Sequence, residues 1–300
     1  MQSTRNVLAR DIALLGLLAT VWGASYTFIK VGVETIPPIT LIASRTIIAA
    51  AILLIVMKVM GVSMPRDAAN WRRFLIQSLI NSVIPFTLIA WAEQYIDAGL
   101  GTILNSTSPI FTFLLTAAIT HHEPVTARKL LGVALGIAGI SLVVGLEALH
   151  GLGTQVIAQL AIVAATLCYA CAAIFGRSFG TLHPLAPAAG SLICGGAILT
   201  PLSLVFEHPW TLTPSTSSLL ALSGLSVFST ALAFILYFHL IRTLGSVGVT
   251  AQAYLRVPVG VLLGIVFLGE TLSTNKVLGL VLVVAGVAAM VIPKRATAKT

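Results

Sequence analysis

Residues 123–144 read EPVTARKLLGVALGIAGISLVV, and residues 270–291 read ETLSTNKVLGLVLVVAGVAAMV. The second stretch begins 147 residues after the first, which is about half of the 300-residue chain. Eight of the 22 aligned positions are identical, and the same ungapped offset also places Asn105 on Gln252. Internal repeats of hydrophobic helices are typical of secondary transporters, in which the substrate site lies between the repeats.

The composition excludes an ordinary soluble domain. Hydrophobic residues make up 57% of the chain, charged residues 9%, and the mean hydropathy is +1.02. Apolar runs of about 18 to 24 residues, each long enough to cross a hydrocarbon layer of about 30 Å, occupy most of the sequence. The predicted spans are 11–33, 38–60, 72–95, 98–120, 126–146, 155–177, 184–206, 217–242, 246–268 and 274–292. The sequence therefore predicts an all-α membrane protein with ten transmembrane helices and short connections.

The formal charge of +8 is explained by topology rather than by a nucleic-acid partner. If the N-terminus lies inside, most basic residues fall on the inner side, which is the positive-inside pattern. These inner residues are Arg5, Arg10, Lys58, Arg66, Arg72, Arg73, Arg128, Lys129, Arg177, Arg242, Lys294, Arg295 and Lys299. The outer connections contain only Lys276, and Lys30, Arg45 and Arg256 lie within spans. We therefore expect both termini to be cytoplasmic.

Each half of the chain contains five predicted spans. Because five is odd, the second copy must enter the membrane from the opposite side, so the repeat is predicted to be inverted. The predicted repeats are residues 1–148 and residues 149–300, with five helices in each. Two inverted repeats around a site near the membrane midplane are the expected architecture for alternating access.

Two arginines lie within predicted spans, where an ionisable side chain is costly. Arg256 is ten residues into its helix, or about 15 Å deep, with Gln252 one turn earlier on the same face. It either serves a substrate or bonds to carbonyls freed by Pro258. Arg45 lies about 10 Å from the outer surface, from which it either snorkels to the interface or contributes to the site.

Uncharged polar and aromatic residues supply the other candidates for a substrate site. Trp22 and Tyr26 share one face of the first span, where they either stack on a ligand or pack in the core. Asn81, Asn105 and Ser229 belong to polar stripes on the third, fourth and eighth spans. Such stripes usually face the bundle interior, although single hydroxyls often only bond to helix carbonyls. We expect the first, third, fourth, sixth, eighth and ninth spans to line the site.

The spans lack several features that a proton pump, an enzyme or a metal-binding protein would require. Every Asp and Glu lies near a span end or in a connection, so the sequence gives no support for a deep proton-carrying carboxylate. A nucleotide-binding loop, a catalytic motif and a metal-ligand pattern are also lacking, so we expect no cofactor and no enzymatic activity. The small residues at Gly132, Gly136 and Gly139 are predicted to pack helices within the chain, or otherwise to form a dimer face. The protein is thus expected to be a monomer or a weak homodimer.

The segment from Trp22 to Lys30, Arg45, and the hairpin after Glu123 with its echo after Glu270 resemble the EamA-type branch of the drug/metabolite transporter superfamily. The resemblance covers nearly the whole chain. It implies a bacterial inner-membrane protein that exports amino acids, other small metabolites or toxic compounds. It also implies roles for Trp22, Tyr26 and Arg45, and for Tyr169, which falls where the second copy often has tryptophan.

The chain departs from this resemblance in two ways. Arg256 stands where an apolar or acidic residue is expected, and the first-helix glutamate of the small multidrug relatives is missing. The sequence therefore favours export of amino acids or related anionic or zwitterionic solutes over drug-proton exchange. Efflux of toxic compounds, a passive channel and a polytopic membrane enzyme are the alternatives. The expected partners are a small-molecule substrate and the lipid bilayer of the cell inner membrane.

Overall fold

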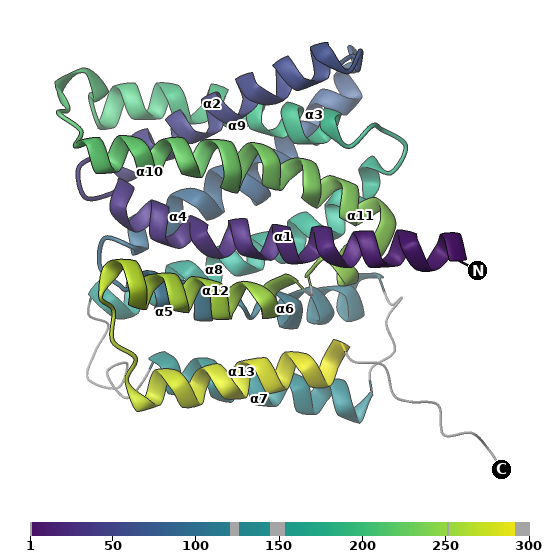
Figure 1. Cartoon of the computed structure of the whole chain (residues 1–300), viewed down its shortest axis with the longest axis vertical. Coiled ribbons are helices and arrows are strands. Elements are labelled where there is room, and N and C mark those ends of the chain that lie inside the picture. Colours follow the sequence, from purple (N-terminus) through teal and green to yellow (C-terminus); the bar gives the residue numbers. More distant parts are fainter. Residues whose placement is uncertain (1, 121–125, 145–153, 251, 292–300) are drawn as a thin grey trace.

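The computed structural model describes residues 2–120, 126–144, 154–250 and 252–291, and within these ranges the chain is helical without any strand (Figure 1). The α-helices are α1 (Gln2–Gly32), α2 (Pro38–Val59), α3 (Ala68–Ser78), α4 (Ile84–Ala92), α5 (Ala98–Asn105), α6 (Ser108–Leu115), α7 (Ala127–Val144), α8 (Thr154–Gly176), α9 (Leu185–Phe206), α10 (Thr216–Ser226), α11 (Ala233–Thr250), α12 (Gln252–Leu268) and α13 (Thr274–Val291). The π-helical turns are η1 (Leu79–Val83), η2 (Thr116–Thr120) and η6 (Val227–Leu232), and the 3₁₀ turns are η4 (Arg177–Phe179) and η5 (Pro209–Thr211).

Seven segments of the described chain are long and apolar enough to cross a membrane. They are Arg10–Gly32, Pro38–Val59, Ala68–Ala92, Ala98–Ala118, Thr154–Phe179, Leu185–Phe206 and Thr216–Leu244. Shorter apolar helices cover Arg256–Leu268 and Thr274–Gly286. Large apolar side chains on their outer faces, such as Phe206, Leu220 and Phe267, are exposed, as expected for contact with lipid. The prediction of an all-α membrane protein is therefore correct.

Several predicted boundaries differ from the observed ones. The third span covers Ala68–Ala92 rather than residues 72–95, so Glu93 begins the connection to α5. The eighth candidate span ends at Leu244, close to the predicted residue 242, but its helix α11 continues to Thr250 and α12 begins at Gln252. The connection predicted at residues 243–245 is therefore helical.

The duplicated stretch forms α7 and α13, which lie side by side (Figure 1). A Cβ atom on Gly139 would lie 2.7 Å from the carbonyl oxygen of Gly279, and one on Gly286 would lie 2.5 Å from the carbonyl oxygen of Gly132. These contacts are reciprocal, because Gly132 aligns with Gly279 and Gly139 aligns with Gly286. The two helices therefore run antiparallel with their backbones in close contact, so these glycines pack helices within the chain.

Two π-helical turns interrupt helices at equivalent positions of the repeats. The offset of 147 places η1, at residues 79–83, on residues 226–230, which overlap η6. Pro85 follows η1 and cannot donate a backbone hydrogen bond. Such turns occur frequently at functional sites.

One end of the bundle is closed by contacts between the two halves of the chain. We call this the distal end, since it lies opposite the start of α1 (Figure 1). Glu207 accepts hydrogen bonds from the first backbone N–H groups of α2, and Glu270 accepts them from those of α5. Lys276 pairs with Asp97 at 2.6 Å. The carboxylates stabilise these helix N-termini, which carry partial positive charge.

Residues at equivalent positions of the repeat cap α7 and α13. Thr126 and Ser273 accept hydrogen bonds from backbone N–H groups three residues later, so both cap the helices that follow. Glu270 has the structural role described above, whereas its counterpart Glu123 lies outside the described residues.

Candidate functional site

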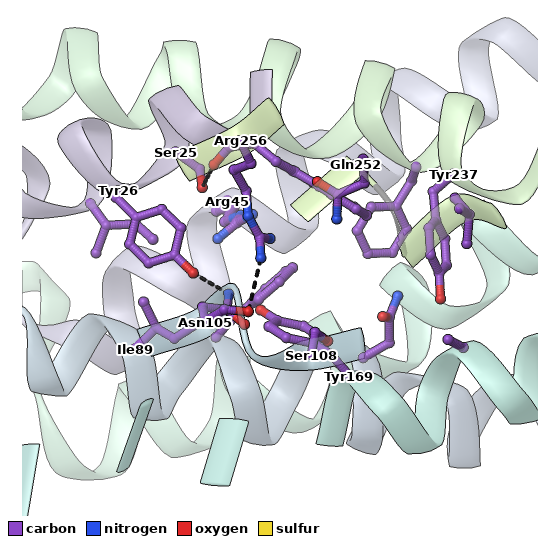
Figure 2. Close-up of a pocket in the computed structure, with 17 residues that line it drawn as sticks. Ser25, Tyr26, Arg45, Ile89, Asn105, Ser108, Tyr169, Tyr237, Gln252 and Arg256 are labelled. Carbon is purple, nitrogen blue, oxygen red and sulfur yellow. Dashed lines mark hydrogen bonds between the residues drawn. The ribbon is translucent and has the colours of Figure 1, made fainter. Parts of the chain in front are cut away.

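A cavity lies inside the bundle, with about 660 Å³ of empty space, part of which is open to solvent (Figure 2). Its lining residues come from both halves of the chain. Eight predicted site residues line it, namely Trp22, Tyr26, Arg45, Asn81, Asn105, Tyr169, Gln252 and Arg256. Apolar walls with a few polar groups are typical of small-molecule sites.

The fourth span breaks at the cavity. Its first part, α5, ends at Asn105, and α6 begins at Ser108. Pro109 has no backbone N–H, so the carbonyl of Asn105, four residues earlier, has no helical donor. Arg256 Nη2 donates to this carbonyl at 3.1 Å. The carbonyl that Arg256 contacts is thus freed by Pro109, not by Pro258 as one sequence interpretation suggested.

The side chain of Asn105 connects three helices around this break. Its Nδ2 donates to the hydroxyl of Tyr26 on α1 (Figure 2), and its Oδ1 accepts a hydrogen bond of 3.1 Å from the hydroxyl of Thr166 on α8. Together with Arg256 on α12, Asn105 therefore joins both repeats at one point of the cavity wall. This network fixes the orientation of the Tyr26 and Arg256 side chains.

Arg45 points into the bundle rather than towards the interface. Its side chain is 2% exposed, its Nε donates to the hydroxyl of Thr230 at 2.6 Å, and its guanidinium carbon lies 3.7 Å from the ring centroid of Phe86. The snorkelling alternative is therefore wrong. Ser229 does not line the cavity, since its hydroxyl donates to the carbonyl of Val21, while its own carbonyl lies 3.4 Å from Arg45 Nη2.

Three polar atoms at the cavity lack a hydrogen-bond partner among the described residues. They are Asn81 Nδ2, Gln252 Oε1 and Arg256 Nε, and each of these residues is more than nine-tenths buried. A buried polar group without a partner costs about 1–3 kcal/mol. The side chains that line the cavity thus include two donor atoms and one acceptor atom that no described residue satisfies. Among the described residues its lining includes two guanidinium groups and no carboxylate.

Aromatic rings form much of the remaining wall. The ring centroids of Trp22 and Tyr237 are 5.4 Å apart, and those of Phe86 and Tyr169 are 6.4 Å apart. Sequence reasoning missed several lining residues, which are Ser25, Ile29, Phe86, Ile89, Ser108, Ala173, Phe234, Tyr237 and Val249. Ser25 and Ile29 lie three and seven residues after Trp22, so helical periodicity was a signal for them.

Lys30, on the same helix, does not reach the cavity. Its ammonium group donates to the backbone carbonyls of Glu93 at 2.6 Å and Ile96 at 2.8 Å, and so it holds the end of α4. The three cysteines, Cys168, Cys171 and Cys194, are partly buried free thiols.

Comparisons with known proteins found one matching family and several relatives. The sequence profile of the EamA-like transporter family matches twice, at residues 11–145 and 156–292. The chain is 27% identical over 279 residues to the uncharacterized inner membrane transporter YedA of Escherichia coli strain K12, covering 92% of this chain and 89% of YedA. It is 26% identical over 282 residues to a probable terminal-alkyne amino-acid exporter of Streptantibioticus cattleyicolor, covering 93% of each protein.

Two further proteins match over a similar share of the chain. The chain is 26% identical to a probable amino-acid metabolite efflux pump of Escherichia coli strain K12, over 92% of this chain and 93% of the pump. A solved crystal structure covers 94% of this chain and 96% of its own length with a TM-score of 0.67 at 19% identity, which shows the fold.

Proposed function

This chain belongs to the EamA-like transporter family of membrane transporters, and from that premise we propose that it exports amino acids or related small anionic or zwitterionic metabolites across the cell inner membrane. The substrate occupies the cavity between the repeats, where Trp22, Tyr26, Arg45, Asn81, Asn105, Tyr169, Gln252 and Arg256 bind it.

One observation carries the choice of substrate class. Arg45 and Arg256 both line the cavity, and no carboxylate of the described chain lines it with them. Arginine presents a planar fork of donors that matches a carboxylate, and charge-assisted hydrogen bonds are about twice as strong as neutral ones. The free Nε of Arg256 offers one such donor, and Asn81 Nδ2 offers a neutral one. Gln252 Oε1 can accept from a substrate amino group.

The transport cycle follows from the repeats. Ten spans in two inverted five-helix units, divided near residue 148, place the cavity between moving halves that open it alternately to each side. With both termini cytoplasmic, the distal end faces outward. Its contacts between Glu270 and α5 and between Lys276 and Asp97 then form the outer closure. Opening that end requires these contacts to break.

The aromatic wall supports efflux of apolar toxic compounds as a second candidate. Trp22, Tyr237, Phe86 and Tyr169 offer ring faces that bind flat organic cations as well as apolar groups. The two buried guanidinium groups argue against a cation, because like charges in a cavity of low dielectric repel.

Matched ligand pairs separate these candidates. Purified protein is titrated calorimetrically with each amino acid of a panel and with the amine that corresponds to it without the carboxyl group. We expect saturable binding of at least one amino acid and at least tenfold weaker binding of its amine. Binding of the amines or of a planar organic cation in preference to every amino acid would favour the second candidate and contradict the first.

A further inference from the structure

Glu93 is a buried carboxyl group that the proposed substrate site does not use. It follows α4 in the connection to α5, its exposed fraction is 0%, and neither Oε1 nor Oε2 has a hydrogen-bond partner among the described residues. The carboxylates of Glu207 and Glu270 near the same end of the bundle each accept two backbone hydrogen bonds. Glu93 therefore lacks the backbone hydrogen bonds that stabilise the carboxylates of Glu207 and Glu270 at the distal end.

Several charged or titratable groups face this carboxyl. Lys30 on α1 has the largest effect among the charged groups, but its ammonium group bonds to backbone carbonyls. Arg45 on α2 and Glu270 after α12 contribute opposite charges, and Tyr26 lies nearby on α1. Burial is the largest influence and raises the pKa of the Glu93 carboxyl well above its ordinary range, against the smaller opposing effect of Lys30. Burial therefore shifts the protonation equilibrium of Glu93 towards the neutral acid.

The carboxyl is connected to the cavity through α1 and α5. A Cβ atom on Gly101 would lie 3.2 Å from the ring of Tyr26 and 3.7 Å from Glu93 Oε1, so the ring and the carboxyl flank the same glycine. The hydroxyl of that ring accepts the hydrogen bond from Asn105 at the cavity wall. One helical turn before Glu93, Ile89 also lines the cavity. A change at Glu93 can therefore move groups that contact the substrate.

We propose that Glu93 is a proton-binding site that couples proton movement to transport, an inference that rests on the proposed transport function. When the distal end is closed, the carboxyl is buried and holds a proton that it has taken up from the opposite side through the cavity. When that end opens, water reaches the carboxyl, the proton leaves to the distal side, and Lys30 becomes free to pair with the carboxylate. Because the two conformations differ in proton affinity, pH shifts the equilibrium between them.

The first test needs no substrate. Infrared difference spectra of the full-length protein in lipid are recorded against Glu93→Gln, with Glu34→Gln as the control because Glu34 is an exposed carboxylate of the α1–α2 connection. We expect a C=O stretch of a protonated carboxyl group at neutral pH that Glu93→Gln removes and Glu34→Gln retains. Its absence from the wild-type protein would overturn the proposal even if transport is established.

The second test separates coupling from transport. Proteoliposomes are loaded with an amino acid found to bind, and exchange at equal pH is compared with accumulation driven by a pH gradient. Glu93→Gln keeps the size of the side chain and mimics the protonated acid, so exchange should persist while gradient-driven accumulation falls at least tenfold. Equal gradient responses of wild type and Glu93→Gln would contradict coupling through Glu93. Absence of exchange in the wild type would instead count against the proposed function, and the infrared result would then decide on Glu93 alone.

Discussion

Arg256 donates a hydrogen bond to a backbone carbonyl that has no helical donor. By the 147-residue offset it corresponds to Pro109, the residue that leaves the Asn105 carbonyl without a helical donor. The guanidinium group supplies that donor from the other repeat, while its Nε remains free at the cavity. A single side chain thus stabilises the break, and in the proposed site it also offers a charge to the substrate. Discontinuous helices with exposed backbone groups are a recurrent feature of transporter sites.

Removing this charge should weaken substrate binding more than it weakens the fold. A hydrogen bond to a charged group contributes about 1.5–3 kcal/mol, so Arg256→Ala should raise the dissociation constant of a bound amino acid about 10- to 150-fold. Arg256→Lys should recover part of the loss. Arg242→Ala, which changes an exposed arginine on α11, serves as the control. Calorimetry that gives equal affinities for wild type and Arg256→Ala would assign Arg256 a purely structural role.

The amide of Asn105 should contribute to stability through Tyr26. Asn105→Leu leaves the buried Tyr26 hydroxyl without its donor, at a cost of about 1–3 kcal/mol. The melting temperature in detergent should therefore fall. In that background Tyr26→Phe removes the unpaired hydroxyl, so the double variant should be more stable than Asn105→Leu alone. Additive losses in this double-mutant cycle would show that the two side chains do not interact.

At the scale of helices, the carboxylate of Glu270 protects the start of α5. Glu270→Gln removes a charge from a helix N-terminus, an effect of about 0.3–2 kcal/mol depending on burial. Hydrogen exchange at the amides of Ala98 and Gly99, measured by mass spectrometry, should accelerate about 2- to 30-fold. Glu34→Gln should leave these amides unchanged. Unchanged protection of these amides in Glu270→Gln would show that the Glu270 carboxylate does not stabilise the start of α5 at the distal end.

The sequence was sufficient to predict helices and repeats but not the details of their packing. The aligned glycines of 123–144 and 270–291 identified a repeat whose helices the structure places in antiparallel contact. Periodicity could not locate the break at residues 106–107, because Ser and Thr are tolerated within membrane helices. Sequence position also placed Glu93 near a span end, which suggested access to water. Its burial depends on the residues that cover it from α1 and α5, which a linear sequence does not reveal.

Site residues could be predicted from the sequence where burying their side chains in a membrane has a high free-energy cost. Arg45, Arg256, Asn81 and Asn105 all line the cavity, since buried charges and amides require a polar environment. Phe86 and Tyr237 line it as well, but aromatic residues are common in any apolar core. Their role follows only from the packing of helices that lie far apart in the sequence.

For the whole molecule, orientation is the first property to test. The distribution of Lys and Arg predicts that both termini are cytoplasmic. A fluorescent protein fused to the C-terminus should therefore fluoresce, and alkaline phosphatase fused at the same position should be inactive. Fusions within the connection after α9 should give the opposite result. Active phosphatase at the C-terminus would reverse the assignment of the distal end to the outside.

The central claim is that the cavity carries a small metabolite between two alternately open states. Proteoliposomes loaded with an unlabelled amino acid that binds should take up the same labelled amino acid against its concentration gradient, by counterflow that saturates. The Arg256→Ala variant should require a much higher concentration of the labelled amino acid to reach the same rate of uptake. Uptake that rises linearly without saturation, or ohmic unitary currents in place of counterflow, would contradict the account.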